Sequence, residues 1–368
     1  MDSPSPDLDQ LFPGARFSPI DPALLDQAQE RLDQLTKPQG SLGELETIAR
    51  RLFAISGGRF PLRIDPAILY TVAADHGVAA QGVSAFPQEV TRQMADNYLN
   101  GGAAINVLCR ANSVNAMLVD AGCLGENFPP HRQLLQRRLG QGSSDLSLGP
   151  AMDEDTCVAA LRNGFAIGCS AAQNGFACIG TGELGIANST AATALYCAFY
   201  GLDPHSITGP GAMAPPPMVK HKADIIARAL QINRAAVDSG DPARILASLG
   251  GLEIATLTGI MLACGANRLP LVVDGFICAS AYAAATAIWP PLADFAFLSH
   301  MSAEPGFAAV VERMKPAQRP LLRLGLRLGE GTGAALAITL LRSAAAIFNE
   351  MATFTSAGVA DKKSGASS

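Results

Sequence analysis

Aromatic side chains are scarce in this sequence, where Phe, Trp and Tyr together account for only 6% of the 368 residues. Hydrophobic residues nevertheless make up 49%, so the core has to be built mainly from Ala, Leu, Ile and Val. The 36 glycines indicate many turns and close backbone approaches around that core. This balance favours an α/β architecture, and the length suits one large domain or two ordinary ones.

Clusters of positive charge are also lacking. The sequence has 27 Lys and Arg residues against 32 Asp and Glu residues, a net charge of −5, and no stretch gathers the charge that binds a phosphate backbone. This argues against nucleic acid as a partner. None of the eight cysteines belongs to a C-x-x-C pair and most lie in apolar stretches, so we expect buried thiols in a reducing compartment.

No segment has the pattern of a secretory signal, because the N-terminus is acidic and Pro-rich and has neither a basic nor an apolar region. We therefore expect a cytoplasmic protein. The stretch most like a membrane span, Phe276 to Trp289, is rich in Ala and falls short of the ~20 apolar residues that cross a bilayer. It is predicted to be a buried helix, and no membrane partner is expected.

From Pro66 onward, short apolar runs end in small or acidic residues: AILYTVAAD, NAMLVDAG, FACIGTG and LPLVVDG. Such runs are typical of buried parallel strands. Stretches with helical spacing of apolar residues separate them, for example at 89–111, 153–174, 189–200, 222–232 and 334–351. The alternation predicts a doubly wound, mostly parallel sheet with helices on both faces, and ligands should bind at the carboxyl ends of its strands.

The segment GTGELGIANST, residues 180–190, follows an apolar run and opens a helix. Glycine N–H groups and a helix N-terminus attract anions, so this segment is a candidate phosphate site. Gly180, Gly182 and Gly185 also spell G-x-G-x-x-G, with Asp203 near the place of a ribose-binding acid, so an NAD-dependent dehydrogenase is one alternative. Against it, no second strand is predicted before Asp203, and the Glu183 carboxylate would repel a pyrophosphate.

A second glycine-rich turn, in LRLGEGTGAALA, places Glu330 between Gly329 and Gly331, just ahead of a helix. Glycines on both sides let a substrate approach the carboxylate closely, which makes Glu330 the best candidate for a general base. The alternative is an acidic residue that stabilises the helix dipole and has no part in catalysis.

Acidic and histidine side chains near other predicted strand ends raise the alternative of a metal-dependent hydrolase. They are Asp75, His76, Asp120, Asp274 and the segment SHMSAE, residues 299–304. The five histidines include no H-x-x-x-H pair, however, and Asp at a strand end commonly caps the next turn. We therefore predict no metal site, and a structural or hydrogen-bonding role for His76 and His300.

Taken in order, these segments resemble the nicotinate-nucleotide:dimethylbenzimidazole phosphoribosyltransferase family, over about Leu35 to Met351. The likeness is carried by LTKPQGSLGELE, AADHGVAAQGVSAFPQEVT, GTGELGIANST, His221-Lys222, the GGLE at Gly250, PLVVDGF, SHMSAE and LRLGEGTGAALA. The chain departs from the family pattern at GPGAMAPPPMVKHK, where Pro215 to Pro217 are expected to stiffen the loop before Lys222.

The resemblance implies transfer of the 5-phosphoribosyl group of nicotinate mononucleotide to dimethylbenzimidazole or a similar base. The products would be α-ribazole 5′-phosphate, for the lower ligand of cobalamin, and nicotinate. It also implies a homodimer without a cofactor, Glu330 as the general base, and Glu183 near the ribose and the reacting centre. The residues implied to bind the nucleotide are Gly185, Asn188, Ser189, Thr190, Gly211, Lys222 and Ser302, and those implied to line the base pocket are Phe86, Met94 and Leu328.

The same resemblance implies a large Rossmann-like domain, residues 61–333, and a small helical domain made from both chain ends, residues 19–60 and 334–357. Apolar spacing between Pro22 and Phe53 fits two helices joined by a KPQG turn. Residues 1–18 and 358–368 are predicted to be a disordered leader and a disordered tail.

Overall fold

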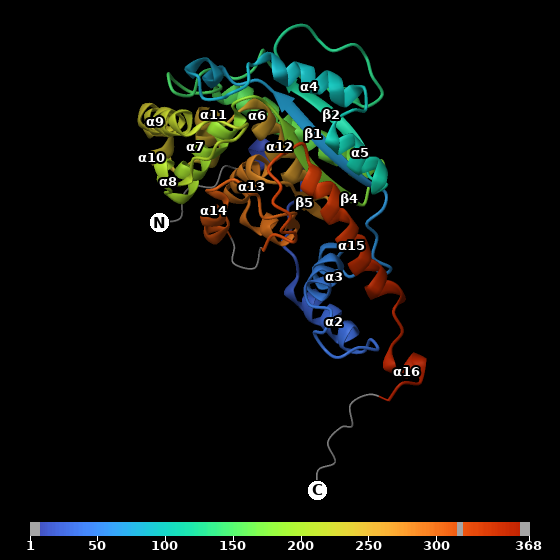
Figure 1. Cartoon of the computed structure of the whole chain (residues 1–368). Helices are drawn as coiled ribbons and strands as arrows, with labels where there is room; N and C mark the ends of the chain where they lie inside the picture. The colour runs from blue at the N-terminus through green and yellow to red at the C-terminus, as the bar shows by residue number, and fades with distance from the viewer. Residues whose placement is uncertain (1–7, 315–318, 361–368) are drawn as a thin grey trace.

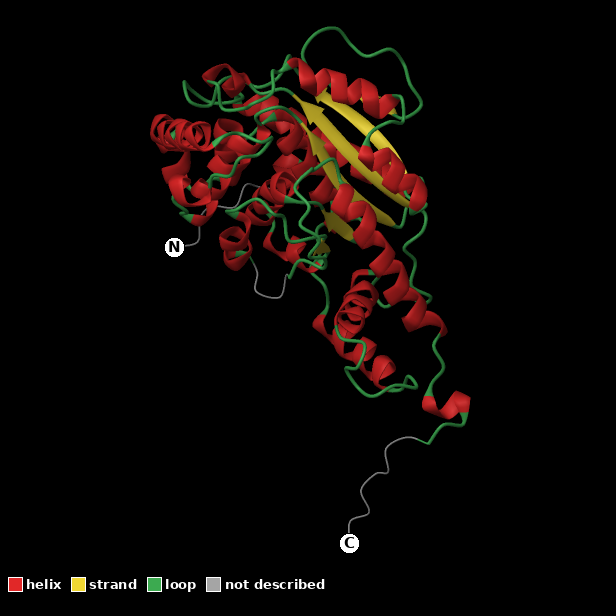
Figure 2. Ribbon diagram, viewed as in Figure 1, coloured by secondary structure: helices red, strands yellow, loops and turns green. Residues whose placement is uncertain are grey.

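The structure is a computed structural model and describes residues 8–314 and 319–360. Parallel strands form a six-stranded sheet in the order β3-β2-β1-β4-β5-β6 (Figures 1 and 2). The strands are β1 Ala67–Ala74, β2 Asn115–Gly122, β3 Leu134–Gln136, β4 Cys178–Leu184, β5 Leu271–Val273 and β6 Ala296–Leu298. This is the strand order of a Rossmann sheet, so the predicted doubly wound parallel architecture is confirmed.

Helices cover both faces of the sheet. On one face lie α4 Glu89–Leu99, α5 Ala104–Ala111 and α15 Thr332–Glu350, and on the other α12 Leu252–Ala266 and α13 Phe276–Ile288, with α6 Glu154–Gln173 against α12 (Figure 1). The remaining helices are α1 Leu8–Leu11, α2 Pro22–Asp33, α3 Glu44–Ile55, α7 Asn188–Tyr200, α8 Pro204–Ile207, α9 Pro216–Ile232, α10 Arg234–Ser239, α11 Pro242–Leu249, α14 Phe307–Arg313 and α16 Phe354–Ala357, with the 3-10 helices η1 Gly77–Gln81 and η2 Pro290–Asp294.

Glycine allows α6 and α12 to pack backbone against backbone. A Cβ atom at Gly164 of α6 would lie 1.9 Å from the carbonyl oxygen of Thr256, and one at Gly259 of α12 would lie 2.0 Å from that of Leu161. A side chain does not fit at such distances. α12 is buried from Leu252 to Gly265 between α6 and the sheet, which explains why it is apolar on every side.

Several element bounds differ from those expected. The helix expected at 89–111 is broken into α4 and α5, because the chain turns at Gly101, whose φ is 77°. α9 begins at Pro216, well before Lys222, since proline suits a first helical turn that needs no N–H donor. The strands β3 and β6 were not expected, because three residues each are too few to show a strand pattern.

Residues 8–18 do not form the disordered leader predicted from the sequence. α1 packs on α6, Leu11 and Phe12 are buried, and the ring of Phe12 stacks on that of Phe165 with centroids 4.3 Å apart. Arg162 of α6 donates hydrogen bonds to the carbonyl oxygens of Leu11 and Gln10, at 2.9 and 2.8 Å. The prediction was wrong here because it weighed the acidic and Pro-rich composition and overlooked these apolar side chains.

Segments from both ends of the chain lie together beside the sheet (Figure 1). α2 packs on α3, α3 packs on α15, and the Thr36 backbone N–H donates to the Ala352 carbonyl oxygen at 2.9 Å. α15 packs both on the sheet and on α3, so its contacts do not separate the two expected domains. The domain bounds at residues 60 and 333 therefore stay predictions. The predicted leader residues 1–7 and tail residues 361–368 lie outside the described residues.

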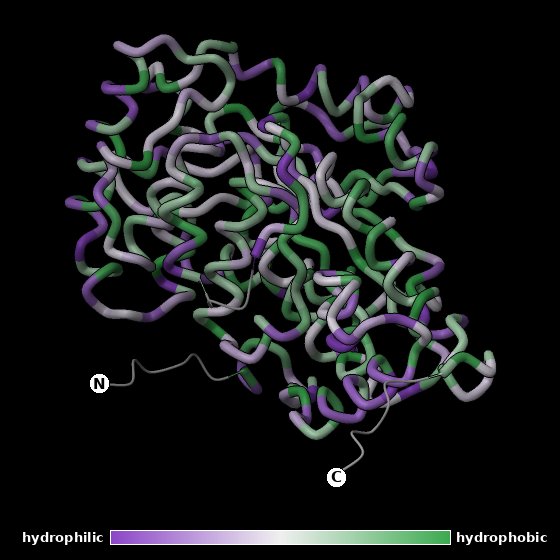
Figure 3. The backbone as a smooth tube through the Cα atoms, turned by 60° about the horizontal axis from the view of Figure 1, so that its bottom comes forward, coloured by the Kyte–Doolittle hydropathy of each residue, from purple (hydrophilic) through white to green (hydrophobic). Residues whose placement is uncertain are grey.

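The most apolar helices are core elements. α13 is buried, as predicted for the stretch Phe276 to Trp289. Among the described helices, α15 is long and apolar enough to cross a membrane, and 56% of its apolar window is buried within the structure. Its apolar composition follows from its packing on the sheet and on α3. Figure 3 shows hydrophilic stretches mostly along the outline of the molecule.

Candidate active site

A cleft of about 650 Å³ opens at the carboxyl ends of β1, β4, β5 and β6, and the segments that follow these strands line it. β1 and β4 are neighbours in the sheet, and the strand order runs in opposite directions from them. Rossmann sheets bind ligands at such a switch point. The position and the volume therefore suit a small-molecule site.

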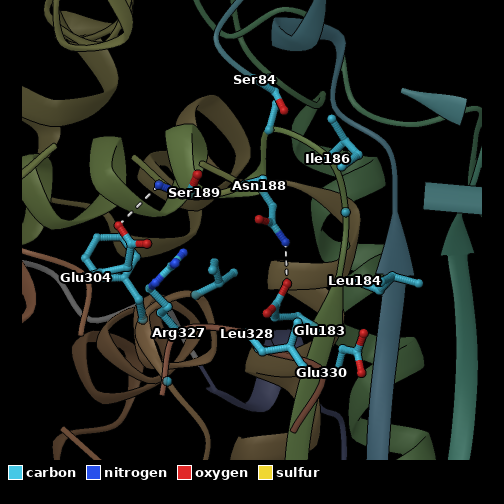
Figure 4. Close-up of a pocket in the computed structure, with 18 of the residues that line it drawn as sticks. Ser84, Glu183, Leu184, Ile186, Asn188, Ser189, Glu304, Arg327, Leu328 and Glu330 are labelled. Carbon is cyan, nitrogen blue, oxygen red and sulfur yellow. Dashed lines mark hydrogen bonds between the residues drawn. The ribbon is translucent and has the colours of Figure 1, made fainter. Parts of the chain in front are cut away.

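Glu183, on β4, is buried at the floor of this cleft, and the Asn188 side chain at the start of α7 donates a hydrogen bond to its Oε2 (Figure 4). Burial raises the pKa of Glu183 to about 8, the Asn188 hydrogen bond opposes the rise, and Asp274, Glu253 and Glu330 add to it. A positive charge brought into the cleft would favour the ionised form of this carboxyl group.

Glu330 stands on a left-handed turn that leads into α15. Its φ is 63°, and Gly329 and Gly331 on either side have φ values of 84° and 97°. Thr71 on β1 donates its hydroxyl to the Glu330 carbonyl oxygen at 2.8 Å, and Asp274 accepts the Gly331 N–H at 3.1 Å. A residue other than glycine adopts such a backbone only where its surroundings hold it, so the turn is built to present Glu330.

The Glu330 carboxyl group is buried, and within residues 8–314 and 319–360 its Oε2 atom has no hydrogen-bond partner. Burial raises its pKa, which the Ile105 N–H lowers in part and the Asp274 carboxylate raises further. Glu183 lies just across Gly329, because a Cβ atom at position 329 would be 2.0 Å from Glu183 Oε1. Gly329 is thus in contact with Glu183 and precedes Glu330 in the chain, and Glu330 has a carboxyl oxygen that is free to accept a proton.

The other end of the cleft gathers hydrogen-bond donors. Lys222 on α9 is buried, and its Nζ donates to Ser189 Oγ at 2.7 Å and to the Gly209 carbonyl oxygen at 3.3 Å. Ser189 belongs to the first turn of α7, whose N-terminus attracts negative charge. Burial lowers the pKa of Lys222 to about 8, and the Glu304 carboxylate opposes this shift. Hydroxyl, ammonium and helix terminus together are suited to a phosphate group.

The remaining wall of the cleft is mostly apolar. Phe86, Met94 and Leu328 line it together with Val90 and Ile186. Phe86 and Leu328 are 45% and 57% exposed, so both side chains are open to a ligand. A flat aromatic base fits such a surface, and its polar edge could face the carboxyl groups on the floor.

The structure brings together most of the residues that the resemblance implied. Those that line the cleft are Glu330, Glu183, Gly185, Asn188, Ser189, Gly211, Ser302, Phe86, Met94 and Leu328. Two others lie behind it. Thr190 is buried in the first turn of α7, and Lys222 meets the cleft through Ser189.

Sequence reasoning weighed Glu304 only as a possible metal ligand, and it missed other polar residues of the cleft. Glu304 Oε2 accepts the Gly211 N–H at 3.4 Å, and Arg327 and Ser84 line the same space (Figure 4). Glu304 and Arg327 lie within the SHMSAE and LRLGEG segments. The signal that could have identified them was their charge, together with their position beside Ser302 and Leu328 in the sequence.

Neither alternative activity has its structural context. Gly180 and Gly182 lie inside β4, and Asp203 precedes the short helix α8, so the glycines do not form a dinucleotide-binding turn. In the described part of the chain, no three His, Cys, Asp or Glu side chains gather in a way that could hold a metal ion. His76 instead contacts Glu253 at 2.7 Å with both side chains buried, and His300 lies 3.8 Å from Asp274.

Comparison with known proteins identifies the family. A family model described as Phosphoribosyltransferase matches residues 17–359. The chain belongs to this phosphoribosyltransferase family.

Similar members of the family share a more specific name. The "Nicotinate-nucleotide--dimethylbenzimidazole phosphoribosyltransferase" of Nitratidesulfovibrio vulgaris (strain DP4) is 55% identical over 345 residues, which cover 94% of this chain and 96% of the relative. That of Geobacter sulfurreducens is 43% identical over 347 residues, 94% of this chain and 97% of the relative. The solved structure of the Thermus thermophilus enzyme is similar with a TM-score of 0.86 at 42% identity, and covers 93% of this chain and 100% of its own. The family inferred from the sequence is confirmed.

Proposed function

We propose that this chain transfers the 5-phosphoribosyl group of nicotinate mononucleotide to dimethylbenzimidazole or a similar base. The observation that carries the proposal is the pair of buried residues Glu183 and Glu330, whose carboxyl groups belong to one cleft. The relatives named above carry this activity in their names.

The nucleotide is proposed to lie along the cleft with its phosphate at the donor-rich end. Ser189, Gly211 and Ser302 would surround the phosphate, with the Lys222 ammonium behind Ser189, because together they combine a helix N-terminus, hydroxyl groups and a positive charge. The ribose would then lie over Glu183. The acceptor base would lie against Phe86, Met94 and Leu328, and this flat apolar surface discriminates poorly among similar rings.

The chemistry of the substrates suits this placement. Nicotinate bonded to C1 of ribose is a cationic pyridinium, so it leaves as a neutral ring and takes the electrons of the C–N bond. Positive charge then develops on the ribose, and a carboxylate at Glu183 would stabilise it. One nitrogen of the incoming base bonds to C1, and the proton of its other N–H passes to Glu330. Attack opposite to the departing ring inverts C1 and gives the α-ribotide.

The test is incubation of the pure protein with nicotinate mononucleotide and a panel of benzimidazole, adenine and phenolic acceptors. Mass spectrometry should detect a ribotide of the acceptor and free nicotinate in equal amounts, and NMR should show the α configuration. Release of nicotinate without a ribotide would instead indicate hydrolysis and would overturn the proposal.

We also propose a homodimer that works in the cytoplasm without a metal or redox cofactor. The family resemblance supports the dimer, and the composition supports the compartment. Light scattering on the purified protein measures the first, and a mass of about twice the 38.1 kDa chain is expected.

A further inference from the structure

One hydrogen bond connects two segments that line the cleft. Thr91 on α4 is buried at 1% exposure, and its Oγ1 accepts the backbone N–H of Ile186 at 3.0 Å. Ile186 belongs to the loop that joins β4 to α7. The bond therefore crosses the switch point of the sheet, from a helix that follows β1 to the loop that follows β4.

The two elements that it joins hold different substrates in the proposed function. α4 presents Met94 to the base pocket, while the loop after β4 connects Glu183 to the nucleotide-binding residues Asn188 and Ser189. Across residues 8–314 and 319–360, the Thr91 bond is the only side-chain hydrogen bond between α4 and this loop. A rotation of α4 against the loop would shift one substrate relative to the other.

Thr91 also has a neighbour on β1. Its hydroxyl accepts from Ile186, so the hydroxyl proton remains free to donate, and the Asp75 carboxyl group after β1 lies beside it. Burial raises the pKa of Asp75, and the hydrogen bonds from the Leu124 N–H and the Thr91 hydroxyl oppose that rise. The Thr91 hydroxyl is thus held by the Ile186 N–H, and the Asp75 carboxyl group lies near it.

We propose that Thr91 is a positioning residue, which keeps the base-binding helix α4 in register with the nucleotide-binding loop so that the acceptor nitrogen meets C1 of the ribose. The inference rests on the proposed function. Small misplacements of reacting atoms reduce rates strongly, because much of catalysis consists of orientation. Thr91 should therefore act on turnover and have little effect on the binding of either substrate alone.

The test compares Thr91→Val, which keeps the shape and loses the hydroxyl, with Thr91→Ser, which keeps the hydroxyl. Thr91→Val leaves the partly buried Ile186 N–H without its acceptor, so kcat should fall about 5- to 100-fold, while the separate dissociation constants of nicotinate mononucleotide and dimethylbenzimidazole change less than about 2-fold. Thr91→Ser should recover most of the lost turnover.

Thr258→Val is the matched control. Thr258 is a buried threonine of α12 whose hydroxyl donates to the Ile254 and Ala281 carbonyl oxygens at 2.8 and 3.2 Å. This substitution should lower the thermal midpoint and leave kcat unchanged, which shows the effect of losing a buried hydroxyl outside the cleft. Hydrogen exchange provides a second measurement that needs no Val variant, since the Ile186 amide of the wild type should exchange more slowly when the base is bound.

The inference is overturned if Thr91→Val keeps kcat within about 2-fold, or if Thr91→Ser is as impaired as Thr91→Val. It is also overturned if both dissociation constants of Thr91→Val rise while its thermal midpoint falls, because Thr91 would then have only a structural role. The wild-type protein in the same assay distinguishes failure of the Thr91 inference from failure of the proposed function. If the proposed function is wrong, no ribotide forms in any sample, including the wild type.

Discussion

Asp274 accepts the N–H of Gly331 at 3.1 Å, and so holds the turn on which Glu330 stands. Its other oxygen accepts the Ala334 N–H at 3.1 Å, so one carboxylate caps the start of α15 and closes the left-handed turn. The strand end at β5 thereby sets the direction of a side chain that follows it by more than fifty residues.

Replacement of Asp274 should therefore disturb catalysis and stability together. Asp274→Ala removes the acceptor of two N–H groups, and loss of a helix cap costs about 0.5–2 kcal/mol of unfolding free energy. We expect a lower thermal midpoint and a kcat at least about 10-fold lower, with nucleotide binding nearly unchanged. Asp274→Asn, which keeps one acceptor, should be intermediate in both. Wild-type turnover in Asp274→Ala would contradict the role of this carboxylate in placing Glu330.

Replacement of Glu330 should affect turnover far more than binding. Glu330→Gln keeps the shape of the side chain and cannot take the proton, so turnover should fall by about 10²–10⁴-fold. The thermal midpoint should hold or rise slightly, since burial disfavours the charged form. If Glu330 only stabilised the helix dipole, the variant would lose about 0.3–1 kcal/mol of stability and keep its turnover.

Glu183→Gln is the control for Glu330, because two carboxyl groups in one cleft can substitute for each other in part. Steady-state rates of both single variants and the double variant are needed. A double variant as active as the wild type would disprove the base assignment and leave positioning and desolvation as the sources of the rate.

Lys222 should strengthen the binding of the phosphate and lower the stability of the folded chain. Lys222→Met should raise the dissociation constant of nicotinate mononucleotide at least about 10-fold and leave that of the acceptor base unchanged. It should also raise the thermal midpoint at neutral pH by roughly 2 °C or more, because burying an ammonium is costly.

The pH dependence of that stability gain has a definite sign. The pKa of Lys222 is about 8 in the folded chain against an ordinary 10.5, so the folded state loses this proton more readily than the unfolded state. The gain of Lys222→Met should be full below about pH 8 and should shrink as the pH rises toward 10.5. A variant that is less stable than the wild type at pH 7 would contradict this account.

The value of kcat/KM for the nucleotide should follow a bell-shaped curve with its maximum near pH 8. Burial raises the pKa of Glu183 to about 8, so its carboxylate form increases as the pH rises, whereas Lys222 loses its charge over the same range. Glu183→Gln should flatten the acidic limb, and Lys222→Met should flatten the alkaline limb. A flat profile from about pH 6 to 9 would rule out both assignments.

Turnover should survive treatment with EDTA. The expectation follows from the donor set, since Glu183, Glu304 and Glu330 all line the cleft, but in the described residues no three His, Cys, Asp or Glu side chains come together as a metal site requires. Rates before and after chelation, with metal analysis of the protein, provide the measurement. A stoichiometric metal whose removal abolishes turnover would favour a different mechanism.

Local patterns predicted the sheet and several of the residues in the cleft. β1, β2, β4 and β5 coincide with apolar runs that end in small or acidic residues, and such patterns arise from neighbours in the chain, so they can be recognised one segment at a time. Glu330 between two glycines was recognisable for the same reason. The short strands β3 and β6, and the packing of Phe12 on Phe165, carry no such local signal.

The contacts that set the chemistry are of a different kind. Glu183 lies against Gly329, the Thr91 hydroxyl accepts the Ile186 N–H, and Lys222 donates to Ser189. Each contact joins segments that lie far apart in the chain. Burial raises the pKa of Glu183 and lowers that of Lys222, and in both cases the burial comes from the packing of such segments against one another. Periodicity reports which face of an element is apolar, but only the folded sheet brings the strand ends together, and their mutual distances and desolvation decide which carboxyl group is available as a base.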